Sequence, residues 1–269
     1  MLVINCKNYS EVATAPRVRR LVRAADSAAA KLGVEVCVAP PQHMIGVAAE
    51  EAASIARERR GAGASSSRRR RRPRRRLLRI LSQHADVQPA GSTTGYVIPE
   101  LLKAAGAEGS IINHSEHRIK PAEIAATVKR LRDAGMTSIL CVRSVRELRK
   151  YVPLGPDYVA IEPPELIGSG RAVSTERPEI ISGAARAVSE PPRASAASRE
   201  SSSSSSSITA AARARPQLLC GAGVVSGADV AKAAELGSAG ILVASGIIKR
   251  GPAQWRSAIM DLAGPLSAR

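Results

Sequence analysis

The stretch SILCVRSVRELRKYVPLGPDYVAIE, residues 138–162, decides the fold class. It begins and ends with short apolar runs, 138–142 and 158–162, and the segment between them has a helix-forming composition. Strands that are apolar on both faces and alternate with helices require a parallel sheet that is covered by helices. The stretch therefore predicts one strand–helix–strand unit of such a sheet.

The same unit recurs along the whole chain. The expected strands are 2–6, 34–39, 79–83, 110–114, 138–142, 158–162, 217–221 and 240–244. The expected helices include 16–31, 121–134, 226–236 and 252–262. Pro121 and Pro252 begin two of these helices, in the first turn, where proline is tolerated. Eight units fit one closed (β/α)8 barrel of ~250 residues, which we expect as a single domain over residues 1–269.

An open, doubly wound sheet is the alternative architecture for such a chain. A dinucleotide-binding sheet of that kind carries a glycine-rich phosphate fingerprint in its first turn. The first turn of this chain, NCKNYSEVA at 5–13, lacks that fingerprint, so the closed barrel is favoured.

Two low-complexity stretches, 60–78 and 190–213, interrupt the alternation of strands and helices. Neither composition buries enough apolar area to offset its ordering entropy, so we expect both as loops or disordered segments on the helix side of the barrel. Most of the net charge of +17 is local, because residues 57–79 hold twelve arginines and one glutamate. A non-catalytic, barrel-derived protein that binds nucleic acid or acts as a scaffold through this segment is therefore the alternative function. With one Trp and no Phe the chain offers little base stacking, and nucleic acid is not an expected partner.

Cysteine usage and the amino terminus indicate the compartment. Four cysteines, Cys6, Cys37, Cys141 and Cys220, are widely spaced in apolar runs, which favours reduced core residues over a disulfide or metal framework. The apolar start of the chain reaches Lys7 too early for a signal peptide, and no apolar run approaches the ~18 residues of a membrane span. We expect a cytoplasmic protein that does not contact membranes.

Polar residues follow several of the expected strands at their carboxyl ends, where a (β/α)8 barrel builds its active site. Asn5 and Lys7 follow the first strand, His114 the fourth and Glu162 the sixth. Small-residue turns at 221–223 and 244–246 can present backbone N–H groups to a phosphate. The pattern predicts one site with a cation, an imidazole and a carboxylate.

Five motifs in this order resemble the triosephosphate isomerase family, specifically its shorter archaeal-type branch. They are NCKNY (5–9), NHSEHR (113–118), EPPELIGSG (162–170), LCGAGVVSGADV (219–230) and ILVASGI (241–247). The resemblance covers nearly the whole chain except the two low-complexity stretches. It implies an isomerase of glycolysis and gluconeogenesis that interconverts dihydroxyacetone phosphate and D-glyceraldehyde 3-phosphate without cofactor or metal.

The resemblance also assigns roles to individual residues. Glu162 matches the catalytic base and neutral His114 the electrophile, whereas Glu165 is expected only in the loop. Asn5 and Lys7 match a substrate-binding pair, and Glu116 an acid that orients its neighbours. The expected phosphate-binding residues are Ile167, Gly168, Gly223, Ala244 and Ser245.

The same resemblance predicts a lid and a subunit contact. Residues 163–170 match a lid over the site, and GSTTGYV at 91–97 resembles a loop that reaches a neighbouring subunit, with Thr94 as the reaching residue. A homodimer or homotetramer is therefore expected. His117 stands where the family commonly has arginine, and with His43 and His84 it is interpreted as a structural or surface residue.

Overall fold

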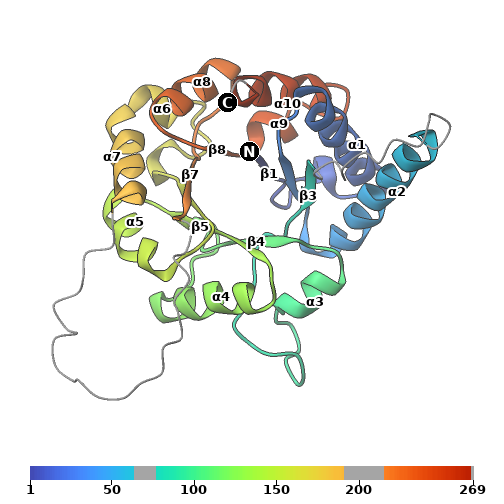
Figure 1. Ribbon diagram of the computed structural model, residues 1–269, viewed down its shortest axis with the longest axis horizontal. Coiled ribbons are helices and arrows are strands. Elements are labelled where there is room, and N and C mark those ends of the chain that lie inside the picture. Colours follow the sequence, from blue (N-terminus) through green and yellow to red (C-terminus); the bar gives the residue numbers. More distant parts are fainter. Residues whose placement is uncertain (64–76, 191–214, 268–269) are drawn as a thin grey trace.

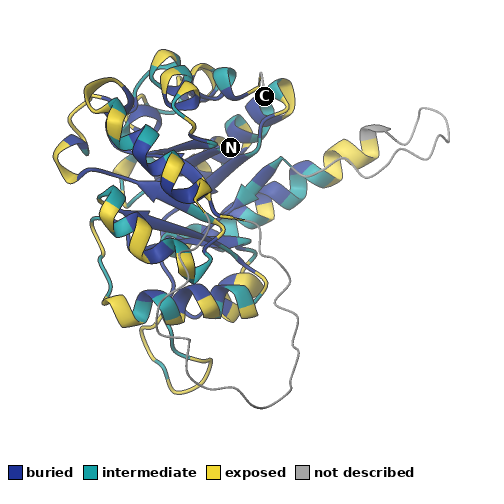
Figure 2. Cartoon of the chain, turned by 60° about the vertical axis from the view of Figure 1, so that its left-hand side comes forward, coloured by how far each residue is buried: buried dark blue, intermediate teal, exposed yellow. Residues whose placement is uncertain are grey.

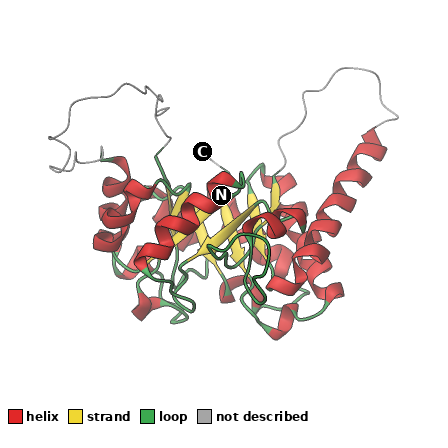
Figure 3. Ribbon diagram, turned by 90° about the horizontal axis from the view of Figure 1, so that it is seen from below, coloured by secondary structure: helices red, strands yellow, loops and turns green. Residues whose placement is uncertain are grey.

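Eight parallel strands form a nearly closed barrel inside a ring of helices in the computed structural model, which describes residues 1–63, 77–190 and 215–267 (Figure 1). The strands are β1 (Leu2–Asn5), β2 (Val36–Ala39), β3 (Leu78–Ile80), β4 (Gly109–Ile112), β5 (Thr137–Val142), β6 (Tyr158–Ile161), β7 (Gln217–Cys220) and β8 (Gly240–Val243). Each strand overlaps its predicted range, so the predicted (β/α)8 fold is confirmed. Seen from the side, the helices enclose the strands (Figure 3).

The eight strands are hydrogen-bonded to one another in the order β3-β2-β1-β8-β7-β6-β5-β4. The first strand pairs with both β2 and β8, and Leu2 lies opposite Val36 and Ile241. The ends of the order meet at a β3–β4 seam, where Ser82 and Ser110 form an isolated parallel bridge. The Ser82 N–H donates to the Gly109 carbonyl at 2.8 Å and the Ile111 N–H to the Ser82 carbonyl at 2.9 Å. This closure rules out the open-sheet alternative.

Each strand is followed along the chain by one or two helices, which bury one face on the barrel. They are α1 (Ala15–Leu32), α2 (Ile45–Gly63), α3 (Pro99–Ala104), α4 (Pro121–Asp133), α5 (Val145–Tyr151), α6 (Val173–Glu176), α7 (Pro178–Ser189), α8 (Gly227–Glu235), α9 (Ser245–Ile248) and α10 (Trp255–Ala263). Short 3₁₀ turns are η1 (Ser10–Val12), η2 (Gln42–Met44), η3 (Val152–Leu154), η4 (Pro164–Leu166) and η5 (Gly264–Leu266). The exposed faces of the helices form the outer surface (Figure 2). None of the helices in the described ranges is long and apolar enough to cross a membrane.

The start of the last helix differs from the prediction. Pro252 does not begin a helix, because residues 252–254 form a turn in which the Gln254 N–H donates to the Gly251 carbonyl at 3.0 Å. The helix begins at Trp255, a fully buried residue whose indole N–H donates to the Ile248 carbonyl at 3.1 Å. The turn thus delays the start of the helix by three residues, from 252 to 255.

The first low-complexity stretch is shorter than predicted at both of its edges. Helix α2 continues to Gly63, and Leu78 already belongs to β3. Arg79 lies in β3, inside the predicted strand 79–83, and its guanidinium pairs with Glu35 at 3.2 Å and donates to Thr137 Oγ1 at 2.6 Å. Residues 64–76 and 191–214 lie outside the described residues, so the loop predictions there stay predictions.

The core has two layers, because alternate strand residues face the barrel interior and the surrounding helices. The inner layer includes Val3, Leu81, Ile111 and Ile139, whereas Leu2 belongs to the outer layer beneath the helices. All four cysteines are free and buried, as predicted. Burial raises the pKa of the Cys37 and Cys220 thiols to about 12, which keeps them protonated and unreactive.

Candidate active site

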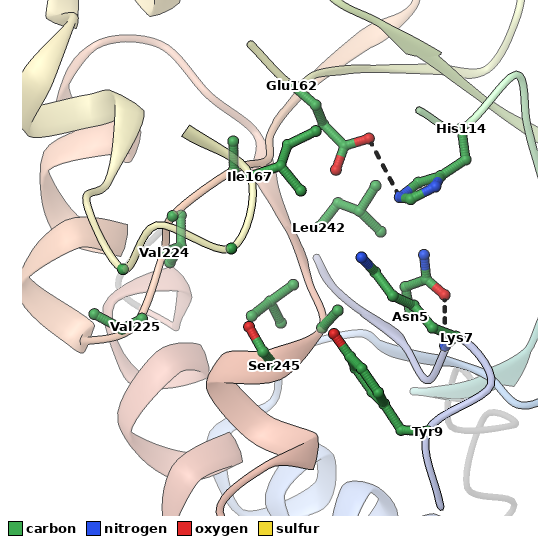
Figure 4. Close-up of a pocket in the computed structure, with 16 residues that line it drawn as sticks. Asn5, Lys7, Tyr9, His114, Glu162, Ile167, Val224, Val225, Leu242 and Ser245 are labelled. Carbon is green, nitrogen blue, oxygen red and sulfur yellow. Dashed lines mark hydrogen bonds and ion pairs between the residues drawn. The ribbon is translucent and has the colours of Figure 1, made fainter. Parts of the chain in front are cut away.

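One pocket at the carboxyl ends of the strands gathers the predicted binding and catalytic residues (Figure 4). All the predicted site residues except Glu116 line it, and they come from five separate parts of the chain. They are Asn5, Lys7, His114, Glu162, Ile167, Gly168, Gly223, Ala244 and Ser245. The fold thus brings together side chains that lie up to 240 positions apart in the sequence, from Asn5 to Ser245.

Glu162 directly follows β6 and faces the pocket. Its N–H donates to the Val142 carbonyl at 2.8 Å, which fixes the start of the loop, and the residue is only 6% exposed. Carboxylate oxygen Oε2 is buried and has no hydrogen-bond partner among the described residues. Because an unpaired buried carboxylate oxygen is costly, Glu162 is poised to accept a proton or a ligand. Burial, and secondly the Glu162 charge, raise the pKa of the neighbouring Cys141 thiol well above its usual range.

His114 presents one ring nitrogen to Glu162. Its Nε2 lies 3.7 Å from Glu162 Oε2, too far for a hydrogen bond but close enough for both groups to touch one small ligand. The other nitrogen, Nδ1, accepts a hydrogen bond from the Glu116 N–H at 3.2 Å. A neutral imidazole that accepts at Nδ1 carries its proton on Nε2, so the donor is directed into the pocket.

Lys7 brings a cation to the same pocket from the loop after β1. Its N–H donates to Asn5 Oδ1 at 3.0 Å, and its ammonium donates to Glu116 Oε1 at 2.6 Å. The side chain of Lys7 is 14% exposed, so the charge is largely shielded from water. Glu116 therefore contacts both Lys7 and the His114 loop without lining the pocket, the position expected for an orienting acid.

Backbone strain is concentrated around the pocket. Among the described residues, three that are not glycine have positive φ: Lys7 at 47°, Asn113 at 56° and Ala222 at 70°. Each lies one or two residues beyond the end of a strand, at the rim of the site. Non-glycine residues in this region cost of order 1–3 kcal/mol each and persist where function or packing requires them.

Two glycines permit close approaches that a side chain would block. A Cβ atom on Gly221 would lie 2.5 Å from Glu162 Cγ, so this glycine leaves room for the carboxylate side chain. A Cβ atom on Gly223 would lie 1.8 Å from the Arg171 carbonyl oxygen, at the end of the predicted lid. The loop after β7 therefore supports both Glu162 and the end of the lid.

The segment predicted as a lid follows Glu162 and forms part of the pocket wall. Gly168 and Gly170 have positive φ, and Ile167 lies beside Glu162 in the pocket wall (Figure 4). Glu165 is exposed, points out of the pocket and faces Arg177 at 3.8 Å. The structure thus separates the two carboxylates of this motif, as predicted.

Sequence reasoning missed several residues that line the pocket. Tyr9 belongs to a quoted motif but received no role, and Leu242 was assigned only to a strand. The others are Val224, Val225 and Val243, whereas Gly170 and Ala222 were expected only as parts of the lid and of the small-residue turn. For Leu242 the signal was present in the alternation of the strand, because residues two apart point to the same side.

The other histidines lie elsewhere. His84 is buried, contacts Asp86 Oδ1 at 3.0 Å and stacks on His117 with ring centroids 4.2 Å apart. Burial chiefly, and the neighbouring His117, lower the pKa of His84, so its ring is neutral near neutral pH. His43 is exposed and lines a separate hollow with Asn8, Tyr9, Ala13 and Pro41.

Comparison with known proteins agrees with this geometry. A family model described as "Triosephosphate isomerase" matches residues 1–253. A triosephosphate isomerase of Cenarchaeum symbiosum is 44% identical over 268 residues, which cover 99% of this chain and 98% of the relative. A triosephosphate isomerase of Methanosarcina barkeri is 38% identical over 92% of this chain and 91% of the relative.

A solved structure is similar in fold. The triosephosphate isomerase of Bartonella henselae superposes with a TM-score of 0.62 over 97% of both chains, at 18% identity. At this identity the likeness concerns the fold alone, and the fold is the barrel described above.

Proposed function

The chain belongs to the triosephosphate isomerase family, and from this premise we propose which residues perform the reaction in its pocket. It is an isomerase that interconverts dihydroxyacetone phosphate and D-glyceraldehyde 3-phosphate, a step of glycolysis and gluconeogenesis. The nucleic-acid-binding alternative is not favoured, because the family match extends over nearly the whole chain. We assign the proton transfer to Glu162 and the polarisation of the carbonyl to His114.

The proton transfer follows from the free carboxylate oxygen of Glu162. Oε2 takes a proton from C1 of dihydroxyacetone phosphate, the C1–H electron pair forms the C1=C2 bond, and the carbonyl π electrons move to the C2 oxygen. His114 donates from Nε2 to that oxygen and exchanges a proton between the two oxygens of the enediolate. Glu162 then returns its proton to C2, which leaves an aldehyde at C1. The single observation that carries this proposal is the unpaired Oε2 that faces Nε2 at 3.7 Å.

Lys7 and the surrounding loops supply the remaining groups. A shielded ammonium stabilises the charge that develops on the enediolate oxygens more strongly than it would in water. We assign the substrate phosphate to backbone N–H groups of Ile167, Gly168, Gly223, Ala244 and Ser245, which line the same pocket. The positive φ of Gly223 supports this assignment, because such turns aim backbone N–H groups at one anion.

Closure of residues 163–170 would complete the site. The two glycines of this segment allow the backbone change, and Ile167 would then cover Glu162. Closure would exclude water from the enediolate and strengthen every electrostatic contact inside the pocket. An assay coupled to a dehydrogenase, run on the purified full chain in both directions, tests the activity itself.

We further propose that residues 1–269 form one domain and that the low-complexity segments are dispensable. In a variant that lacks 64–76 and 191–207, we expect a folded and active isomerase, because surface insertions add only slowly growing loop-closure entropy. The deletions remove ten arginines and one glutamate, so the formal charge falls from +17 to +8 and retention on RNA should fall.

Activity, thermal melting and RNA retention at increasing salt are compared between this variant and the full chain. Loss of isomerisation with full RNA binding would contradict the proposal, since it would place the basic surface on the barrel and make the insertions part of the active fold.

We propose a homodimer or homotetramer that is built through the loop at 91–97. Thr94 and Tyr96 are exposed, Tyr96 to 51%, and the hollow lined by Asn8, Tyr9 and His43 lies beside the active site. A second copy could place its Thr94 in this hollow. The variant Thr94→Arg should therefore give a lower mass by light scattering together with lower activity, because the arginine cannot fit. An unchanged mass would rule out this contact.

We propose a cytoplasmic location, on the grounds of the cysteines and of the kind of substrate. The four free, buried thiols suit a reducing compartment, and phosphorylated trioses are substrates of metabolism inside cells.

A further inference from the structure

Tyr9 occupies a wall of the pocket that the mechanism above does not use. It lies in the loop after β1 and lines the pocket together with Ala244 and Ser245. Its hydroxyl end points into the pocket near Ser245, and Glu162 and His114 lie across the pocket from it (Figure 4). Among the described residues, no group accepts a hydrogen bond from this hydroxyl. A neutral donor is thus available at the end of the pocket assigned to the phosphate.

A cation covers the face of the Tyr9 ring. Lys249 Nζ lies 4.3 Å from the ring centroid, and Lys7 Nζ lies 6.0 Å from it. Glu11 holds Lys249 in place, with Oε1 at 3.0 Å and Oε2 at 3.2 Å from the ammonium. A hydrogen bond from its own backbone and the bond from Lys249 lower the pKa of Glu11, so the carboxylate is ionised at neutral pH.

This arrangement changes the chemistry of the phenol. A cation over an aromatic face is attracted to the ring and draws electron density from it, which strengthens the O–H as a hydrogen-bond donor. The other side chains that line this side are the Ser245 hydroxyl and the apolar Val224 and Val225. Of the two hydroxyls here, the Tyr9 hydroxyl is the one on a ring that faces a cation, and Lys249 and Glu11 set its orientation and strength.

We propose that Tyr9 is a further substrate-binding residue, whose hydroxyl donates to the phosphate group of the triose, with Lys249 and Glu11 as positioning residues. This inference rests on the proposed function, which places the phosphate in this pocket. It adds a side-chain ligand to a set that otherwise consists of backbone N–H groups.

The test is Tyr9→Phe in the full chain, with inorganic phosphate as a competitive inhibitor and glyceraldehyde 3-phosphate as substrate. Loss of one hydrogen bond to a charged acceptor should raise both KM and the phosphate Ki about tenfold. The kcat should stay within about twofold, because the bond is present before and during the reaction. Tyr151→Phe is the matched control, since Tyr151 is buried outside the pocket and also has a lysine, Lys150, 5.3 Å from its ring centroid.

Lys249 variants test the positioning role. Lys249→Met should raise the phosphate Ki about threefold, and Lys249→Arg, which keeps the cation over the ring, should restore most of the affinity. If Lys249 had only a structural role, both variants would change the melting temperature and leave the phosphate Ki unaltered. That result would remove Lys249 from the proposal.

The outcomes separate this inference from the proposed function. An unchanged Ki in Tyr9→Phe, in an otherwise active enzyme, overturns the role of Tyr9 and leaves the isomerase assignment intact. A raised Ki accompanied by a lower mass in light scattering would assign Tyr9 to the subunit contact and also overturn the proposal. A parent chain that neither isomerises trioses nor binds phosphate would instead overturn the proposed function.

Discussion

Glu162→Gln should lower kcat by several powers of ten and leave the fold unchanged. The amide has the shape of the carboxylate, so it still fits the space beside Gly221, but it cannot accept the proton from C1. A positioned general base contributes about 10²–10⁴-fold, and loss of the negative charge next to His114 adds to the effect. Activity within about tenfold of the parent would end the assignment of the base.

Glu165→Gln is the matched control for this experiment. Glu165 belongs to the same motif, three residues away, but it is exposed and faces Arg177 instead of the pocket. Loss of the Glu165 carboxylate should lower kcat by less than about tenfold, because it affects only the segment at 163–170. Both variants are measured by initial rates in each direction, with circular dichroism as the check on folding. Equal losses at the two positions would mean that the wrong carboxylate was chosen.

The second largest effect is expected for His114→Ala. In the proposed mechanism the imidazole acts on charge that develops at the substrate oxygen, so kcat should fall about 10²–10³-fold with little change in KM. The Glu116 N–H loses its acceptor at His114 Nδ1, but Asn113 still anchors the loop by donating to the Cys141 carbonyl at 2.9 Å. The loop should therefore keep its place.

Lys7→Ala gives the contrasting signature. In the proposed mechanism the ammonium contacts the substrate before and during the reaction, so kcat should fall and KM should rise. Comparing the two variants in full saturation curves separates a transition-state donor from a group that also binds the ground state. If His114→Ala changed KM alone, its role as the electrophile would have to be abandoned.

The regular part of the fold could be predicted because it depends on local pattern. Apolar runs of four to six residues, such as those at β5 and β6, alternate with helical segments, and this alternation specifies the barrel. Boundaries that depend on tertiary contacts could not be predicted. Helix α10 begins only at Trp255, whose buried indole N–H donates to the Ile248 carbonyl, and α2 continues to Gly63, inside a stretch that was expected as a loop.

In the candidate site, too, features that depend on local pattern could be predicted and features that depend on tertiary contacts could not. Glu162, His114 and Lys7 were found because their motifs end strands, and strand ends meet at one rim of a barrel. The proton position on His114 could not be predicted, since it depends on a backbone N–H that the fold places at Nδ1. Tyr9 was passed over for a related reason, because only the folded chain brings Lys249, 240 positions later, onto its ring.

The β3–β4 seam has a consequence for the thermal behaviour of the barrel. Local opening proceeds first where short strands share few hydrogen bonds, and β3 is the shortest strand of the described barrel. Gln83, just past this strand, donates to the Lys7 carbonyl at 2.8 Å and to the Ala39 carbonyl at 3.0 Å. When the β3–β4 seam opens locally, the hydrogen bond from Gln83 to the Lys7 carbonyl is lost as well. On heating, the activity would then be lost when the seam opens. Backbone amides near the seam would exchange hydrogen early, before the helices on the opposite wall melt.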